Sequence, residues 1–203
     1  MGKTTGSKTQ KILGDFHQDR AKKGIQLDQF AHALERNSEF LKVQASMEDS
    51  VVYMDNYINL QYTGPLYFGT PLQGNDDAKF FYDTGTGTSI VTSKLCGNGC
   101  LSQYYDSTKS TTSQAKSSTN TTIYSLLAGN VTGTYINDRV CINEKLCADD
   151  WTFFEIEDTQ KMLNFDGILG FSPINGSAEH DTSFVKALYD AGEIPEMVAT
   201  FQL

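Results

Sequence analysis

The chain has 203 residues, of which 39% are hydrophobic, so it is long enough to bury the core of one domain and to carry an extension. Its net charge of −9 at pH 7 argues against nucleic acid or an anionic membrane surface as a partner, because clustered Lys and Arg normally bind such ligands. No apolar run is long enough to predict a membrane span.

The first fifty residues differ from the rest in charge and in pattern. They carry 8 Lys or Arg and 7 Asp or Glu, which leaves 8 basic and 18 acidic residues, a net charge of −10, for residues 51–203. Apolar residues recur at helical spacing over about 26–45. No apolar segment typical of a signal peptide follows Met1, so we expect the natural chain to begin further upstream. We divide the chain into a leader, 1–50, and a domain, 51–203.

From Tyr53 onward, short β-prone runs alternate with Gly, Asn, Asp and Ser, which is typical of an all-β sandwich or barrel. The Ser- and Thr-rich stretch 107–120 is expected to be an exposed loop, and 182–191 is expected to form a helix that Gly192 ends. The expected strands are 56–61, 66–68, 79–82, 89–92, 121–127, 131–136, 139–142 and 151–157.

The expected strand 79–82 leads directly into Asp83-Thr84-Gly85. A carboxylate between an apolar strand and a turn that favours glycine is well placed to be buried and hydrogen-bonded, as many catalytic acids are. The tripeptide alone is a weak signal, since many junctions between a strand and a turn share it. A phosphate-binding loop is excluded, because no Lys follows Gly87 at the required place and no helix-forming run succeeds the turn.

Four cysteines fall into two close pairs, Cys96 with Cys100 and Cys141 with Cys147. Short loops within turn-rich sequence favour two local disulfides. A four-cysteine zinc site is the alternative, although such spacings are not those of most zinc knuckles and ribbons. No other metal ligands cluster in the sequence. The three histidines, which are too scattered for a metal site or a catalytic triad, are His17, His32 and His180.

Three sequons begin at Asn120, Asn130 and Asn175, and these residues are candidate glycosylation sites. Together with the disulfides they favour the secretory pathway, with a lysosome-like or vacuole-like compartment or the cell exterior as the destination. We expect no cofactor.

Four further motifs surround Asp83 in a fixed order. They are Gly-Thr-Pro-Leu-Gln at 69–73, Cys96 with Cys100, Tyr124 ahead of Val-Thr-Gly at 131–133, and Asp-Gly-Ile-Leu-Gly at 166–170. This order resembles the amino-terminal lobe of the pepsin-like aspartic proteases over about residues 57–203. The resemblance implies an all-β lobe of the closed, double-ψ β-barrel type with short helices. It also implies a short disulfide loop at the first cysteine pair.

The same resemblance assigns a role to Asp83. It would be one of two aspartates that share a proton, so that one takes a proton from water while the other polarises the scissile carbonyl of a polypeptide substrate. Thr84 and Gly85 would build the loop that lets the two carboxylates approach, and Thr86 would donate to the Asp83 carboxylate. Asp166, in contrast, is expected to be structural.

Tyr124 aligns with the tyrosine of the flap, a β-hairpin that closes over the substrate and excludes water. The hairpin tip, 125–130, is about two residues longer and more apolar than is usual in the family. The tryptophan that bonds the flap tyrosine in the family aligns with Ile90, which has no donor. A core or edge-strand tyrosine is therefore the alternative for Tyr124.

The leader resembles a pro-segment that covers the cleft and places a lysine against the catalytic carboxylates. Lys22, Lys23 and Lys42 are the candidates for that lysine, and a solvent-facing position is the alternative for each.

No second Asp-Thr-Gly or Asp-Ser-Gly occurs in the 203 residues, so the sequence supplies one catalytic carboxylate. Three explanations compete: a fragment of a two-lobed protease, a lobe that is active only as a homodimer, and an inactive relative that binds peptides. We favour the fragment, in which the second lobe lies in the same natural chain. A different class of function is a secreted peptide-binding or carbohydrate-binding β-domain, in which Asp83 is only a turn acid.

Overall fold

The computed structural model describes residues 51–57, 61–117, 119–172 and 183–201. They belong to one compact unit, Ser50–Leu203. Several predictions fall outside the described residues: the helix within 1–50, the lysines Lys22, Lys23 and Lys42, the histidines His17, His32 and His180, and the sequon at Asn175.

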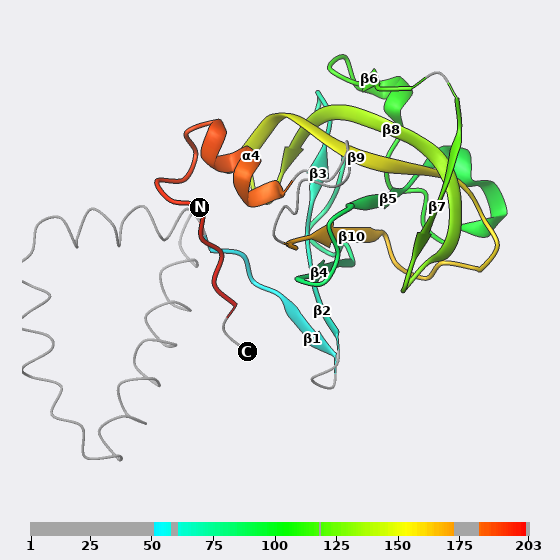
Figure 1. The fold of residues 1–203 in the computed structure, drawn as a ribbon, viewed down its shortest axis with the longest axis horizontal. Helices are drawn as coiled ribbons and strands as arrows, with labels where there is room; N and C mark the ends of the chain where they lie inside the picture. Colours follow the sequence, from blue (N-terminus) through cyan, green and yellow to red (C-terminus); the bar gives the residue numbers. More distant parts are fainter. Residues whose placement is uncertain (1–50, 58–60, 118, 173–182, 202–203) are drawn as a thin grey trace, which may run out of the picture. The chain divides into compact units, whose positions relative to one another are not determined.

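Ten strands form one sheet in the described part of the chain (Figure 1). The sheet order is β1-β2-β4-β10-β5-β9-β8-β3, and β6 and β7 pair with β8. The strands are β1 (Asp55–Tyr57), β2 (Gln61–Gly64), β3 (Tyr67–Phe68), β4 (Phe80–Asp83), β5 (Ile90–Thr92), β6 (Gln114–Ala115), β7 (Thr121–Ser125), β8 (Gly129–Cys141), β9 (Cys147–Thr159) and β10 (Gly167–Gly170). The short helices are η1 (Lys94–Gly99), η2 (Ser107–Lys109) and α4 (Phe184–Asp190). The predicted all-β class is confirmed.

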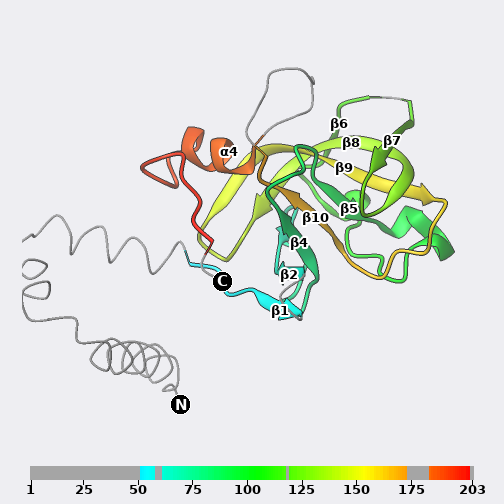
Figure 2. The same ribbon diagram turned by 60° about the horizontal axis from the view of Figure 1, so that its bottom comes forward.

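The longest strands, β8 and β9, form a curved antiparallel ribbon (Figures 1 and 2). The sequence predicts two strands at 131–136 and 139–142, but the structure joins them into β8. The turn-prone residues between them stay extended because their side chains find partners elsewhere. Asp138, which is 1% exposed, accepts hydrogen bonds from the Tyr105 hydroxyl at 2.6 Å and from Thr112 Oγ1 at 2.5 Å.

The Ser- and Thr-rich stretch 107–120 is mostly exposed, as predicted, but it is not a plain loop. It contains η2, which Asp106 caps by accepting from the Thr108 N–H, and it contains β6, which pairs with β8. These contacts attach the stretch to the outer surface of the long ribbon.

The core consists of two clusters, one on each side of β9, because alternate side chains of a strand point to opposite faces. Phe153 belongs to the first cluster, together with Phe68 and Phe80. Phe154 belongs to the second cluster, together with Ile90. The second cluster also contains Val131, Ile156, Leu163, Phe165, Ile168 and the half-cystines Cys96 and Cys100.

Helix α4 packs against the first core cluster through its buried face. Its residues Phe184 and Leu188 are four apart, so they lie on one helix face, and both are buried. Phe184 packs edge-on against Trp151 with the ring centroids 4.9 Å apart. Ser183 begins the helix by accepting from the Lys186 N–H. No helix in the described residues is long and apolar enough to cross a membrane.

Candidate active site

Asp83 is the last residue of β4, and its side chain is half-buried. Each carboxylate oxygen has a donor from the loop that follows. The Gly85 N–H donates to Oδ1 at 2.8 Å, and the Thr86 hydroxyl donates to Oδ2 at 2.5 Å. Hydrogen bonds to a charged acceptor are short and strong, so these two donors fix the orientation of the carboxylate. Thr84 and Gly85 are exposed, which leaves the tip of the loop open to solvent.

Strand β10 and the two residues after it support this loop through backbone contacts. Strands β4 and β5 flank residues 84–89, and β10 lies between them, parallel to β4 and antiparallel to β5. The register places Gly170 beside Asp83. Beyond β10, the Phe171 N–H donates to the Asp83 carbonyl at 2.8 Å, and the Ser172 N–H donates to the Thr86 carbonyl at 3.1 Å.

Two glycines allow β10 to lie this close. A Cβ atom at Gly170 would lie 2.4 Å from the Thr86 carbonyl oxygen, and one at Gly167 would lie 2.2 Å from the Ile90 carbonyl oxygen. Real Cβ contacts are essentially never shorter than 3.0 Å. The spacing of the two glycines in Asp-Gly-Ile-Leu-Gly therefore reflects two points of close backbone approach.

Asp166 lies at the opposite end of β10 from Asp83. Its Oδ2 accepts the Lys79 N–H at 2.6 Å, and its carbonyl accepts both the N–H and the hydroxyl of Thr92. Asp166 thus connects the residues just before β4 with the end of β5 and makes no contact with the Asp83 carboxylate. This geometry agrees with the structural role expected from the sequence.

Tyr124 lies in β7, within the hairpin that β7 forms with β8. Its side chain is 72% exposed, so it is not a core tyrosine. At the hairpin tip Leu126 is 83% exposed, and Gly129 has a φ of 76°, which favours glycine. Ile90, the residue in place of the family tryptophan, is buried in the second core cluster and does not face solvent.

The sequence of residues 61–203 matches the family model of eukaryotic aspartyl proteases. This match covers more than half of the chain. The chain belongs to the eukaryotic aspartyl protease family.

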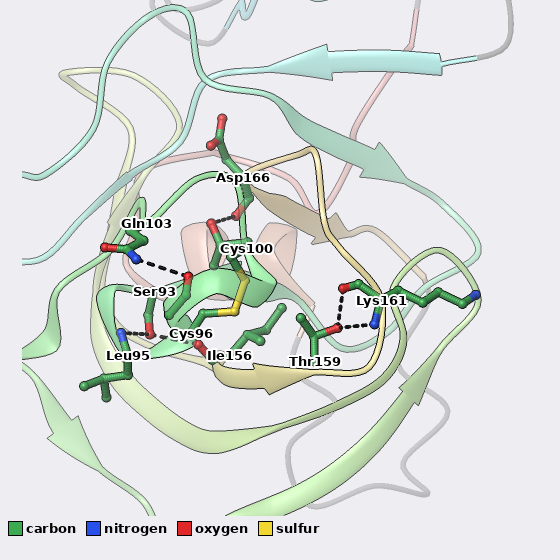
Figure 3. Close-up of a disulfide and its surroundings, with 11 residues drawn as sticks. Ser93, Leu95, Cys96, Cys100, Gln103, Ile156, Thr159, Lys161 and Asp166 are labelled. Carbon is green, nitrogen blue, oxygen red and sulfur yellow. Dashed lines mark hydrogen bonds between the residues drawn. A yellow bond between two sulfur atoms is a disulfide. The ribbon is translucent and has the colours of Figure 1, made fainter.

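Both predicted disulfides are present in this member of the family. Cys96 of η1 is joined to Cys100, the residue that follows η1, with the Cα atoms 5.8 Å apart, and the bridge packs over Ile156 (Figure 3). Cys141 and Cys147 are opposite residues of the β8–β9 hairpin, with the Cα atoms 4.0 Å apart. Cysteines in disulfides have no thiolate for zinc, so the alternative four-cysteine zinc site is wrong.

One buried acid was not singled out by the sequence analysis. Glu155 in β9 is 2% exposed, and its Oε1 has no hydrogen-bond partner among the described residues. Burial is the main cause that raises its pKa to about 7, and the charge of Glu157 adds to the rise. The signal was present in the sequence: position 155 lies inside the apolar run Phe153–Ile156, where a strand is covered on both faces.

An apolar hollow adjoins the exposed side of the Asp83 loop. Its volume is about 660 Å³. Thr84 lies on its rim, and Phe171 packs edge-on against Phe201 in its wall. Val185, Met197 and Ala199 complete the apolar lining, and Ser183 and Lys186 also line the hollow.

Proposed function

We propose that this chain is the amino-terminal lobe of an aspartic endopeptidase and that Asp83 is one of its two catalytic aspartates. The observation that carries the proposal is the Asp83 carboxylate, which receives one donor on each oxygen while the loop tip beside it stays exposed. An acid held in this way, at a surface that a second lobe can cover, is suited to share a proton with another carboxylate.

In the proposed reaction the ionised carboxylate of the pair takes a proton from water as the water oxygen attacks the peptide carbonyl carbon. The neutral carboxyl transfers its proton to the carbonyl oxygen, which becomes a hydroxyl. Transfer of a proton to the leaving nitrogen then breaks the C–N bond. Thr86 and Gly85 orient Asp83, and the hairpin with Tyr124 closes over the extended polypeptide substrate.

The second carboxylate comes, in this proposal, from a second lobe with its own Asp-Thr-Gly or Asp-Ser-Gly in the longer natural chain. The apolar hollow beside Thr84 favours a protein surface as its neighbour, because water is a poor partner for such a lining. A homodimer of the lobe is the alternative arrangement, and it would supply two copies of Asp83.

The disulfides fit an oxidising compartment. We propose that the enzyme works in an acidic organelle or outside the cell, where the aspartate pair holds its single proton.

The test compares the 203-residue chain alone with the chain supplied with a complementary second lobe. Cleavage of an unfolded protein is measured at acidic pH, with and without a transition-state analogue that carries a hydroxyl in place of the scissile carbonyl. We expect inhibitor-sensitive cleavage only with the second lobe present. Asp83→Asn should abolish the cleavage, whereas Asp77→Asn, an exposed control on the same lobe, should leave it unchanged.

Two outcomes would revise the proposal. Cleavage by the monomeric chain alone would contradict the need for a second lobe. Cleavage that rises with the square of chain concentration would identify the homodimer as the active species.

A further inference from the structure

The hairpin that carries Tyr124 also carries a sequon, Asn130-Val131-Thr132. The Asn130 side chain is exposed, and its amide nitrogen makes a long contact, 3.5 Å, with the Gln160 side-chain oxygen. The middle residue, Val131, is fully buried and fixes the strand against the core. The reactive amide of the sequon therefore projects from a strand whose other face is anchored.

Strand register decides which face the sequon occupies. Tyr124 and Asn130 are directly opposite each other in the β7–β8 pair, and Ile123 and Val131 form the next pair. Directly opposite side chains lie on the same face of a sheet with their Cβ atoms about 5 Å apart. Ile123 and Val131 pack into the second core cluster, so Tyr124 and Asn130 share the outer face (Figure 1 shows the hairpin).

We propose that Asn130 carries an N-linked oligosaccharide that covers the Tyr124 face of this hairpin. The donor is an oligosaccharide linked to a lipid diphosphate. The Asn130 Nδ2 attacks the anomeric carbon, a C–N bond forms, the bond from carbon to the diphosphate oxygen breaks, the amide loses one proton and the lipid diphosphate leaves. Transfer takes place on the extended chain, before the hairpin closes against the core.

The sequon at Asn120 provides a comparison within the same hairpin. Its amide nitrogen donates to Glu157 Oε2 at 2.6 Å, and its side-chain oxygen accepts from the Thr134 hydroxyl, so this side chain is held against β8 and β9. It lies four residues from Tyr124 along the strand, a distance of roughly 13 Å. A glycan there is beside the base of the hairpin and does not face Tyr124 directly.

The consequence concerns access to the site. A bulky hydrated glycan next to Tyr124 would leave room for an extended peptide beneath the hairpin and would obstruct a folded domain. This part rests on the proposed function, since it takes the hairpin as the flap. Occupancy of Asn130 and shielding of Tyr124 depend only on passage through the secretory pathway.

The experiment expresses the full chain with a signal sequence in a eukaryotic secretory host. Peptide mass mapping reads occupancy, and nitration of Tyr124 by tetranitromethane, located by the same mapping, reads shielding. We expect a glycan on Asn130. Nitration of Tyr124 should rise several-fold in Asn130→Gln and after enzymatic deglycosylation of the wild type, and it should stay unchanged in Asn120→Gln.

An unmodified Asn130 would overturn the proposal. So would a glycan whose removal leaves nitration of Tyr124 unchanged. Enzymatic deglycosylation keeps the test valid if Asn130→Gln is not secreted, because the wild-type protein then gives both states. Neither readout requires cleavage of a substrate, so a failure of the protease proposal is recognised separately, by the activity assay.

Discussion

The Thr86 hydroxyl orients the Asp83 carboxylate by a direct hydrogen bond. It donates to Oδ2 at 2.5 Å, and the Gly85 N–H serves the other oxygen. Replacement by Val keeps the size of the side chain and removes the donor. Because a hydrogen bond to a charged group contributes about 1.5–3 kcal/mol, we expect Thr86→Val to lower kcat/KM by about 10-fold to 100-fold in the two-lobed enzyme.

Thr86→Ser is the matched control, since it retains the hydroxyl and loses one methyl group. It should keep most of the activity, measured as kcat/KM on the same peptide. Equal losses in the two variants would show that packing at position 86, and not the hydroxyl, supports Asp83.

The raised pKa of Glu155 predicts that the free energy of unfolding depends on pH. The folded pKa of about 7 lies above the ordinary value of 4.5, so the folded state holds its proton more tightly than the unfolded state. The stability that this carboxyl contributes is fully present below about pH 4.5 and is lost as pH rises through 7. The loss amounts to about 3 kcal/mol by linkage. Glu155→Gln should flatten this part of the profile, measured by urea unfolding between pH 4 and pH 8.

Asp158→Asn is the control for that measurement, because Asp158 is an exposed acid of the same strand. It should leave the pH profile as in the wild type. A Glu155→Gln variant that loses as much stability between pH 4 and pH 8 as the wild type would show that other groups cause the dependence.

Among the elements, β10 has glycine at two of its four residues, and both glycines are points of close backbone approach. A Cβ atom at Gly167 would also meet the Phe80 ring, at 2.4 Å, besides the Ile90 carbonyl. Neither the backbone nor a buried ring can move away easily, so Gly167→Ala should destabilise the domain by about 3 kcal/mol or more. Thermal and urea unfolding measure the effect.

Gly192→Ala separates steric overlap from backbone strain. Gly192 follows α4 with a φ of 78°, and nothing lies within 4 Å of an added Cβ, so this substitution should cost only about 1 kcal/mol. Similar losses for Gly192→Ala and Gly167→Ala would contradict the view that β10 is positioned by close backbone contact.

The short local features of this fold follow from the sequence. Asp83 at the end of a strand, the two cysteine pairs and the helix that Gly192 ends each depend on residues within a few positions of one another, where turn and strand propensities act directly. Strand pairing over long distances is different. β10 is only four residues long, and its place between β4 and β5 depends on residues about 80 positions earlier.

Tertiary contacts also override local signals at particular residues. Asn137 and Asp138 read as a turn, yet β9 pairs with both and buried partners satisfy their side chains. Acidic side chains are mostly exposed in proteins, yet Glu155 is buried, with Ser93 and Ser107 beside it. At the site, the sequence indicates Asp83 and its Thr86 donor, whereas the Gly85 N–H donor to Oδ1 becomes visible only in the folded loop.

At the scale of the whole molecule, the charge is divided unevenly between the near-neutral leader and a domain with a net charge of −10. We propose that the leader binds the domain through its cations and that acid releases it. Exposed Asp and Glu side chains in proteins are ordinarily ionised at neutral pH and become protonated as the pH falls below about 4, which weakens their attraction to Lys and Arg.

Residues 51–54, just before β1, are open to a protease. Val51 is 48% exposed and Tyr53 is 71% exposed, and neither belongs to a strand. Strand β1 begins at Asp55 and pairs with β2, so cleavage after that point would have to break a sheet. We therefore expect limited proteolysis of the full chain to cut between about residues 42 and 54.

The last prediction concerns the nicked protein. At pH 7 the cut leader should stay bound and elute with the domain in size-exclusion chromatography, because the acidic domain attracts the leader's lysines and arginines. At pH 4 the two should separate. High salt at pH 7 should imitate acid, since exposed charges are screened over about 3 Å at 1 M ionic strength. A leader that stays bound in acid and in high salt would show that apolar contacts hold it, and a leader that is already free at pH 7 would contradict its role as an inhibitory segment.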